Sequence, residues 1–225
     1  MVRSTLRLAV LVTAVICSAV SAFADSGELL TFQGLNDMQS VGSFYNGAGL
    51  ASTPNYGVTF SSNFFGLTSI QNGGAGNFSA TPTTTPAIFI NGPTGSPATG
   101  VMNVAPGFAN GLNFYYTAGF TGGQTETITV WSGANGTGTV LATIVLGSNN
   151  SSCSFPAYCT WSVAGASFSG TAHSVTFSGP ANELGLADIT IGSSATAIPE
   201  PSSIYLLGSG LVAISVSKMR RFFSA

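Results

Sequence analysis

The sequence predicts an all-β domain, an antiparallel β-sandwich of the jelly-roll type, in the middle of a chain of 225 residues. Two observations predict it. Apolar and aromatic residues come in short blocks that alternate with polar ones, and turns rich in Gly, Pro and Asn separate the blocks. No window of about twelve residues between the ends shows a helical period. About ten strands at this spacing favour a sandwich.

The predicted strands, in chain order, are residues 28–32, 57–61, 67–70, 87–91, 100–104, 111–117, 125–131, 139–146, 160–163, 174–178 and 187–191. In TETITVW, the seventh of them, Glu126, Ile128 and Val130 share one side, and the Thr and Trp residues share the other. The loop SGANGTG then leads into the eighth strand, which predicts a β-hairpin.

All Lys and Arg side chains lie at the two ends of the chain: Arg3, Arg7, Lys218, Arg220 and Arg221. The 173 residues from 25 to 197 contain none. Each basic cluster flanks a short apolar run, and this pattern holds one end of a segment on the cytoplasmic side of a membrane. We therefore expect the middle of the chain to be exported and to contact a membrane only through the terminal segments.

The N-terminus has the parts of a secretory signal peptide. A basic stretch, MVRSTLR, precedes an apolar run over residues 8–20, and Ala22 and Ala24 supply the small residues that signal peptidase needs. The pattern predicts a signal helix over residues 1–24, with cleavage after Ala24.

The C-terminus has three parts in order: Pro199-Glu200-Pro201, an apolar run over residues 204–216, and a basic patch. This order resembles the PEP-CTERM sorting signal of Gram-negative bacteria, over residues 198–225. The resemblance implies that a membrane-embedded exosortase recognises and cleaves the chain. It also implies an inner-membrane intermediate, followed by the cell surface or the extracellular matrix, where such proteins accompany exopolysaccharide.

Helix geometry favours a transient signal over a permanent anchor. Residues 204–216 span about 20 Å as a helix, whereas the hydrocarbon core is roughly 30 Å thick. Pro199 and Pro201 disfavour helix around Glu200 and leave an extended backbone for a processing enzyme. The alternative is a tail anchor that follows an unrelated Pro pair. The chain thus divides into a signal peptide (1–24), a β-sandwich domain (25–197) and a sorting signal with a short transmembrane helix (198–225).

The middle segment is acidic, with six carboxylates and no Lys or Arg, so its expected net charge is near −6: Asp25, Glu28, Asp37, Glu126, Glu183 and Asp188. Nucleic-acid binding requires basic residues that neutralise phosphates, so this composition excludes DNA and RNA as partners. Acidic polysaccharide is repelled as well. Binding to extracellular polysaccharide would then need a neutral glycan, aromatic stacking or bridging calcium.

Two cysteines, Cys153 and Cys159, remain after signal removal, six residues apart in a Pro-containing loop. In an exported chain this spacing predicts a disulfide. Free thiols are the alternative.

Several stretches, among them TFQGL, FYNGA and LADITIG, look like a domain that often precedes PEP-CTERM signals and resembles carbohydrate-binding jelly rolls. Calcium is the one cofactor considered, with Glu28 on the first strand and Asp188 on the last as ligands. The alternative for both is a solvated acid at a strand end. Chains with the domain that this sequence resembles tend to carry an acid near the position of Gln33, so this chain departs there from the pattern that a borrowed metal site would need.

Tyr115 and Tyr116 are adjacent in a predicted strand, so one of them must point outward, where it could stack on a sugar ring. No spacing selects a pair of catalytic carboxylates. The sequence therefore predicts a non-catalytic surface or matrix protein. A lectin-like carbohydrate-binding module is the first alternative, and a secreted hydrolase that uses Glu126, Glu183 or Asp188 is the second.

Overall fold

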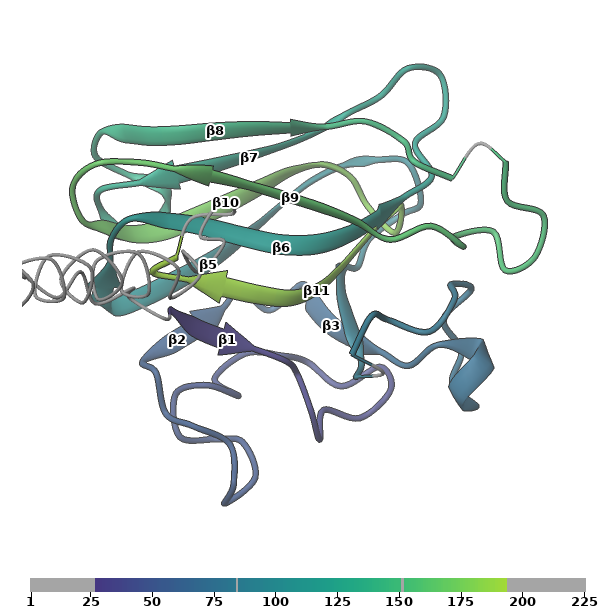
Figure 1. Ribbon diagram of the computed structural model, residues 1–225, viewed down its shortest axis with the longest axis horizontal. Coiled ribbons are helices and arrows are strands. Elements are labelled where there is room, and N and C mark those ends of the chain that lie inside the picture. The colour runs from purple at the N-terminus through teal and green to yellow at the C-terminus, as the bar shows by residue number, and fades with distance from the viewer. Residues whose placement is uncertain (1–26, 84, 151, 194–225) are drawn as a thin grey trace, which may run out of the picture. The chain divides into compact units, whose positions relative to one another are not determined.

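The protein is two antiparallel β-sheets packed face to face, as described by a computed structural model for residues 27–83, 85–150 and 152–193 (Figure 1). The predicted all-β sandwich is confirmed. The signal peptide and the sorting signal, with Ala22, Ala24 and Pro199-Glu200-Pro201, lie outside the described residues.

Sheet A has six strands. In spatial order it contains β3 (Phe64–Leu67), β4 (Ala87–Ile90), β11 (Leu184–Ile191), β6 (Gly111–Ala118) and β9 (Ser162–Ser167), and β1 (Glu28–Leu30) also pairs with β11. Sheet B has five strands: β2 (Val58–Phe60), β5 (Pro97–Phe108), β10 (Ala172–Pro180), β7 (Glu126–Trp131) and β8 (Val140–Leu146). Two short 3-10 helices, η1 (Ile70–Asn72) and η2 (Ala134–Gly136), lie in loops.

The predicted hairpin is confirmed, because β7 and β8 pair antiparallel across the Gly-rich loop. The strand expected at residues 67–70 is wrong: the strand is β3, and it ends where that range begins. The chain leaves the sheet there because the Ser69 hydroxyl accepts a hydrogen bond from the backbone of Gln71, and Gly73 ends the turn with a φ of 83°.

Strand β11 holds sheet A together. It pairs with β6 along one edge and with both β4 and β1 along the other. The first and last strands of the domain are therefore neighbours, with Glu28 opposite Ile191. From β4 onward the chain alternates between the two sheets, except at the β7–β8 hairpin.

Aromatic rings join the two sheets through the core. Phe64 on β3 lies 5.3 Å from Phe60 and 5.5 Å from Phe177, measured between ring centroids, and both contacts are edge-to-face. Phe60 belongs to β2 and Phe177 to β10, so Phe64 connects sheet A with sheet B. Such pairs stabilise a core beyond the area that they bury.

One acid faces this apolar interior. Along β7, Glu126, Ile128 and Val130 are buried, while the Thr and Trp residues between them are half-buried, as the alternation in the sequence predicts. Glu126 is only 1% exposed, and its Oε1 has no hydrogen-bond partner. Burial in this environment raises the pKa of Glu126 to about 8.

Candidate functional site

A bulge in β11 places Asp188 where the edge of the strand passes from β4 to β1. Leu186 pairs with Ile88 on β4, and Ile189 pairs with Leu30 on β1. The register against β6 shifts between Ala187 and Thr190, and Asp188 has a φ of 50°. Asp is among the few residues with a side chain that accept this conformation, and bulges re-aim side chains.

The Asp188 carboxylate is buried at 4% exposure and accepts hydrogen bonds from a distant part of the chain. The Thr83 hydroxyl lies 2.8 Å from both Oδ1 and Oδ2 and donates to them. Burial raises the pKa of Asp188, and the hydrogen bond from Thr83 opposes this increase. Asp188 therefore has a positioned carboxylate with little direct access to solvent.

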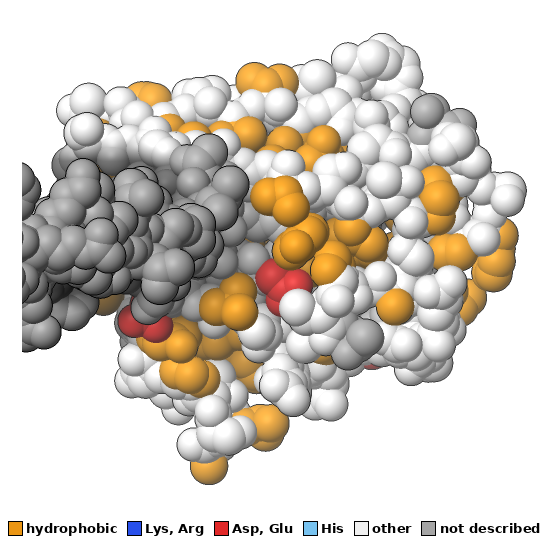
Figure 2. Space-filling view, viewed as in Figure 1, with side chains coloured by type: hydrophobic (Ala, Val, Ile, Leu, Met, Phe, Trp, Pro, Cys, Tyr) orange, Lys and Arg blue, Asp and Glu red, His pale blue; other side chains and the backbone are white. Residues whose placement is uncertain are grey.

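Tyr115 lies beside this bulge on the outer face of sheet A. It pairs with Ala187 on one side and with Val163 on the other, and Val163 is 56% exposed. Tyr116 pairs with Leu186 and packs against the core, so the ring that faces outward is that of Tyr115. Figure 2 shows this face: apolar side chains gather on it among polar ones, acidic side chains appear as well, and no Lys or Arg side chain does.

The structure does not bring Glu28 and Asp188 together around one ion. Glu28 is opposite Ile191, three residues beyond Asp188 along β11, which corresponds to about 10 Å. Calcium takes six to eight oxygen ligands, and no three His, Cys, Asp or Glu side chains cluster as metal ligands within the described residues. Backbone carbonyls and amide oxygens can also serve as calcium ligands, so the calcium site at Asp188 stays a prediction.

The acids contribute less surface charge than their number suggests. Glu126, Glu183 and Asp188 are all buried, and Glu126 is protonated at neutral pH because its pKa is raised to about 8. Glu28 and Asp37 are the exposed carboxylates among the described residues. Repulsion of acidic polymers is accordingly weaker than a net charge near −6 would give.

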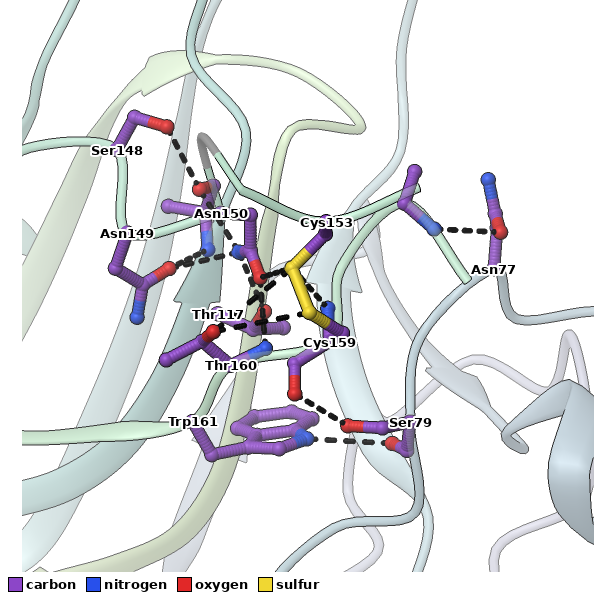
Figure 3. Close-up of a disulfide and its surroundings, with 12 residues drawn as sticks. Asn77, Ser79, Thr117, Ser148, Asn149, Asn150, Cys153, Cys159, Thr160 and Trp161 are labelled. Carbon is purple, nitrogen blue, oxygen red and sulfur yellow. Dashed lines mark hydrogen bonds between the residues drawn. A yellow bond between two sulfur atoms is a disulfide. The ribbon is translucent and has the colours of Figure 1, made fainter. Parts of the chain in front are cut away.

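The predicted disulfide is confirmed, and it closes a loop against sheet A (Figure 3). The Cα atoms of Cys153 and Cys159 are 5.7 Å apart. Asn150 fixes the base of this loop: its Nδ2 donates to the Thr117 hydroxyl on β6 at 2.8 Å, and its Oδ1 accepts from the Thr160 backbone at 2.8 Å. A buried amide with several partners gives the loop a defined position.

A second segment, residues 77–79, pairs with the disulfide loop over the same face. Phe78 and Tyr158 form a parallel bridge, and the Trp161 indole donates to the Ser79 carbonyl at 3.2 Å. The Phe78 and Trp161 rings are in edge-to-face contact at 5.7 Å. Beneath these two segments lies a mainly apolar cavity of about 190 Å³, between Phe78, Tyr158 and Phe89 of β4.

Removing the disulfide, as in Cys153→Ala/Cys159→Ala, will lower the free energy of unfolding by about 2 kcal/mol. Loop-closure entropy for a loop this short gives that value. Urea denaturation at fixed pH measures the change, and reduction of the wild-type protein should reproduce it. An unchanged midpoint in both experiments would show that the disulfide does not stabilise the fold.

The three acids considered for hydrolysis do not face one another across a cleft. Glu126 begins β7 in sheet B and points between the sheets, whereas Asp188 lies at the edge of β11 in sheet A. Glu183 lies between β10 and β11, and its backbone carbonyl accepts from Gly119. Sequence reasoning missed Thr83 and Asn150, since a contact with a residue 105 or 33 positions away leaves no local pattern.

The part of the chain that the structure describes holds no helix with the length and hydropathy that a membrane span requires. No described protein family matches the chain, and no curated protein matches it.

Among solved structures, cleaved adhesin domains of Lys-gingipain are similar to the sandwich. The K2 cleaved adhesin domain is 13% identical with a TM-score of 0.48, over 74% of this chain and 99% of that domain. The K1 domain from Porphyromonas gingivalis W83 is 12% identical with a TM-score of 0.43, over 75% and 98%. The K3 domain of the same strain is 15% identical with a TM-score of 0.35, over 51% and 78%.

Proposed function

We propose that this is an exported, non-catalytic protein of the cell surface or extracellular matrix of a Gram-negative bacterium, sorted by an exosortase and associated with exopolysaccharide. One observation supports the proposal. A segment without Lys or Arg is followed, in order, by Pro199-Glu200-Pro201, a short apolar run and a basic patch. We assign its sandwich to the jelly-roll type, because consecutive strands alternate between the sheets.

Two structural features support this proposal. The last strand, β11, ends at Ile191, so the sorting motif follows the sandwich and does not interrupt it. The Cys153–Cys159 disulfide suits an oxidising compartment outside the cytoplasm. The separate positions of Glu126 and Asp188 are compatible with a protein that is not an enzyme.

Substituting the motif, as in Pro199→Ala/Glu200→Ala/Pro201→Ala, will leave an unprocessed chain in the inner-membrane fraction. The reason is that the proposed exosortase reads these three residues before it cleaves. Immunoblots of fractionated cells will show the same retained, larger form when the wild-type chain is expressed without exosortase.

The matched control is Ser202→Ala/Ser203→Ala, which should be processed as the wild-type chain is. Identical size and location of the motif variant and the wild-type chain would refute exosortase sorting.

Binding of a glycan is the second candidate function. The observation that favours it is the outward ring of Tyr115 beside exposed Val163. A glycan array with the exported protein tests it, and Tyr115→Ala shows whether this face of sheet A is responsible.

A further inference from the structure

The outer face of sheet B carries hydroxyl groups in register on neighbouring strands. Thr129 on β7 lies between Thr143 on β8 and Thr176 on β10. One step along the strands, Ser178 on β10 lies between Thr127 on β7 and Thr99 on β5. We name these six residues the hydroxyl platform: Thr99, Thr127, Thr129, Thr143, Thr176 and Ser178.

The geometry of the sheet spaces these hydroxyls regularly. Neighbouring strands are about 4.8 Å apart, and alternate residues of one strand are about 6.7 Å apart. Thr99 and Thr143 are exposed and the other four are half-buried, while the residues between them along β7 and β10, such as Ile128 and Phe177, are in the core. The platform therefore faces away from the interior along its whole width.

Trp131 adds an aromatic ring at one end of the platform. It is opposite Ser174, but its indole Nε1 donates to the Thr176 hydroxyl at 2.9 Å, so the ring leans across β10. The register of β8 shifts opposite Trp131, and a bulge at this place re-aims the side chain. The half-buried indole is thus fixed beside the hydroxyls.

The loop between β7 and β8 borders the hydroxyl platform at the same end as Trp131. Asn135 in η2 accepts from the Asn103 side chain at 2.8 Å and donates its backbone N–H to Asn103 Oδ1 at 2.7 Å. The Gly136 backbone donates to the Ser174 hydroxyl at 2.9 Å. At the opposite end, Pro97, Thr99 and Ser178 line an open hollow of about 370 Å³.

No residue of the platform carries a charge, and the nearest acid on β7, Glu126, points into the core. Hydroxyls both donate and accept hydrogen bonds, as sugar hydroxyls do. An indole face suits the apolar face of a sugar ring. This combination matches a neutral polysaccharide, since a charged polymer would find no ionic partner here.

We propose that the outer face of sheet B binds a neutral polysaccharide, which lies across β7, β10 and β5 with one sugar ring on Trp131. The inference rests on the proposed function in one respect: a protein of the extracellular matrix has such a polymer near it. This proposal specifies the class of polymer, and it places the binding surface on sheet B and not on the face of sheet A that carries Tyr115.

The test is a binding assay of the purified exported protein with amorphous cellulose, chitin, dextran and, as the acidic comparison, alginate. We expect wild-type protein to bind at least one neutral polymer, with little dependence on salt. Trp131→Ala should weaken that binding by about tenfold or more, as loss of a stacking residue does. Trp131→Phe should restore part of it.

Further variants separate binding from folding and one face from the other. Thr127→Val/Thr129→Val keeps the shape of the platform and removes two hydroxyls, so it should also weaken binding. Leu50→Ala, which changes an exposed residue outside both surfaces, should bind as the wild type does, and Tyr115→Ala tests the alternative surface on sheet A. Thermal unfolding of each variant confirms that it is folded.

Three outcomes would overturn the proposal: no binding to any neutral polymer, binding unchanged in Trp131→Ala, or binding lost in Tyr115→Ala alone. Because the assay uses purified protein, its result is independent of the fractionation test of sorting.

Discussion

Glu126→Gln will make the protein more stable at pH 8 and will remove most of the pH dependence of its unfolding free energy between pH 4.5 and pH 8. In the folded protein Glu126 keeps its proton up to about pH 8, whereas in the unfolded chain it releases the proton near pH 4.5. Unfolding in this window releases a proton, so rising pH favours the unfolded state. Across this pH window the free energy of unfolding of the wild-type protein falls by on the order of 5 kcal/mol.

Urea denaturation at pH 4.5, 6 and 8 measures this effect. Glu28→Gln is the matched control, because it removes an exposed carboxylate instead of a buried one. Parallel pH profiles for Glu126→Gln and the wild type would show that Glu126 is ionised in the folded state.

The residue opposite Glu126 explains how its carboxyl fits between the sheets. A Cβ atom at Gly179 on β10 would collide with Oε2 of Glu126, so only Gly leaves the necessary room. The carboxyl is therefore enclosed against the backbone of Gly179, and Glu126 is only 1% exposed. This enclosure is the cause of its raised pKa.

Phe64→Ala will lower the free energy of unfolding by about 3 to 5 kcal/mol, the usual range for a buried Phe in a core. Gly100→Ala will lower it by about 1 to 3 kcal/mol, because the new methyl group would lie against Cε2 and 2.6 Å from Cζ of the Phe64 ring. In a Phe64→Leu background those ring atoms are absent, so Gly100→Ala should cost about 1 kcal/mol less.

A double-mutant cycle by urea denaturation measures this coupling. Gly147→Ala is the control, because a Cβ there has no atom within 4 Å and the substitution should be nearly neutral. Additive effects of Phe64→Leu and Gly100→Ala would contradict the predicted contact between the two sheets.

Local patterns in the sequence were enough to predict most of the strands. The alternation in TETITVW separated the two sides of β7 correctly, and the Gly-rich loop predicted its hairpin with β8. The strand near residue 67 was misplaced because Phe64 and Phe65 start it, and two adjacent aromatics show no alternation. Which strands pair depends on contacts between distant residues and could not be read from the chain.

The candidate site was predictable only in part. The sequence showed that one of Tyr115 and Tyr116 must face outward, but the register with Leu186 decides that it is Tyr115. The disulfide was predictable from spacing and export. The pairing of Asp188 with Thr83 was not, since the bulge that aims this carboxylate depends on three neighbouring strands.

The central place of β11 has a consequence for when the protein can fold. A chain that crosses a membrane from its N-terminus delivers β11 last, yet β1, β4 and β6 all depend on it for pairing. Sheet A cannot close until residue 191 has emerged, and contacts between such distant parts of a chain form slowly. If the chain is exported as proposed, we expect residues 25–197 to stay unfolded, and open to proteases, until translocation is almost finished.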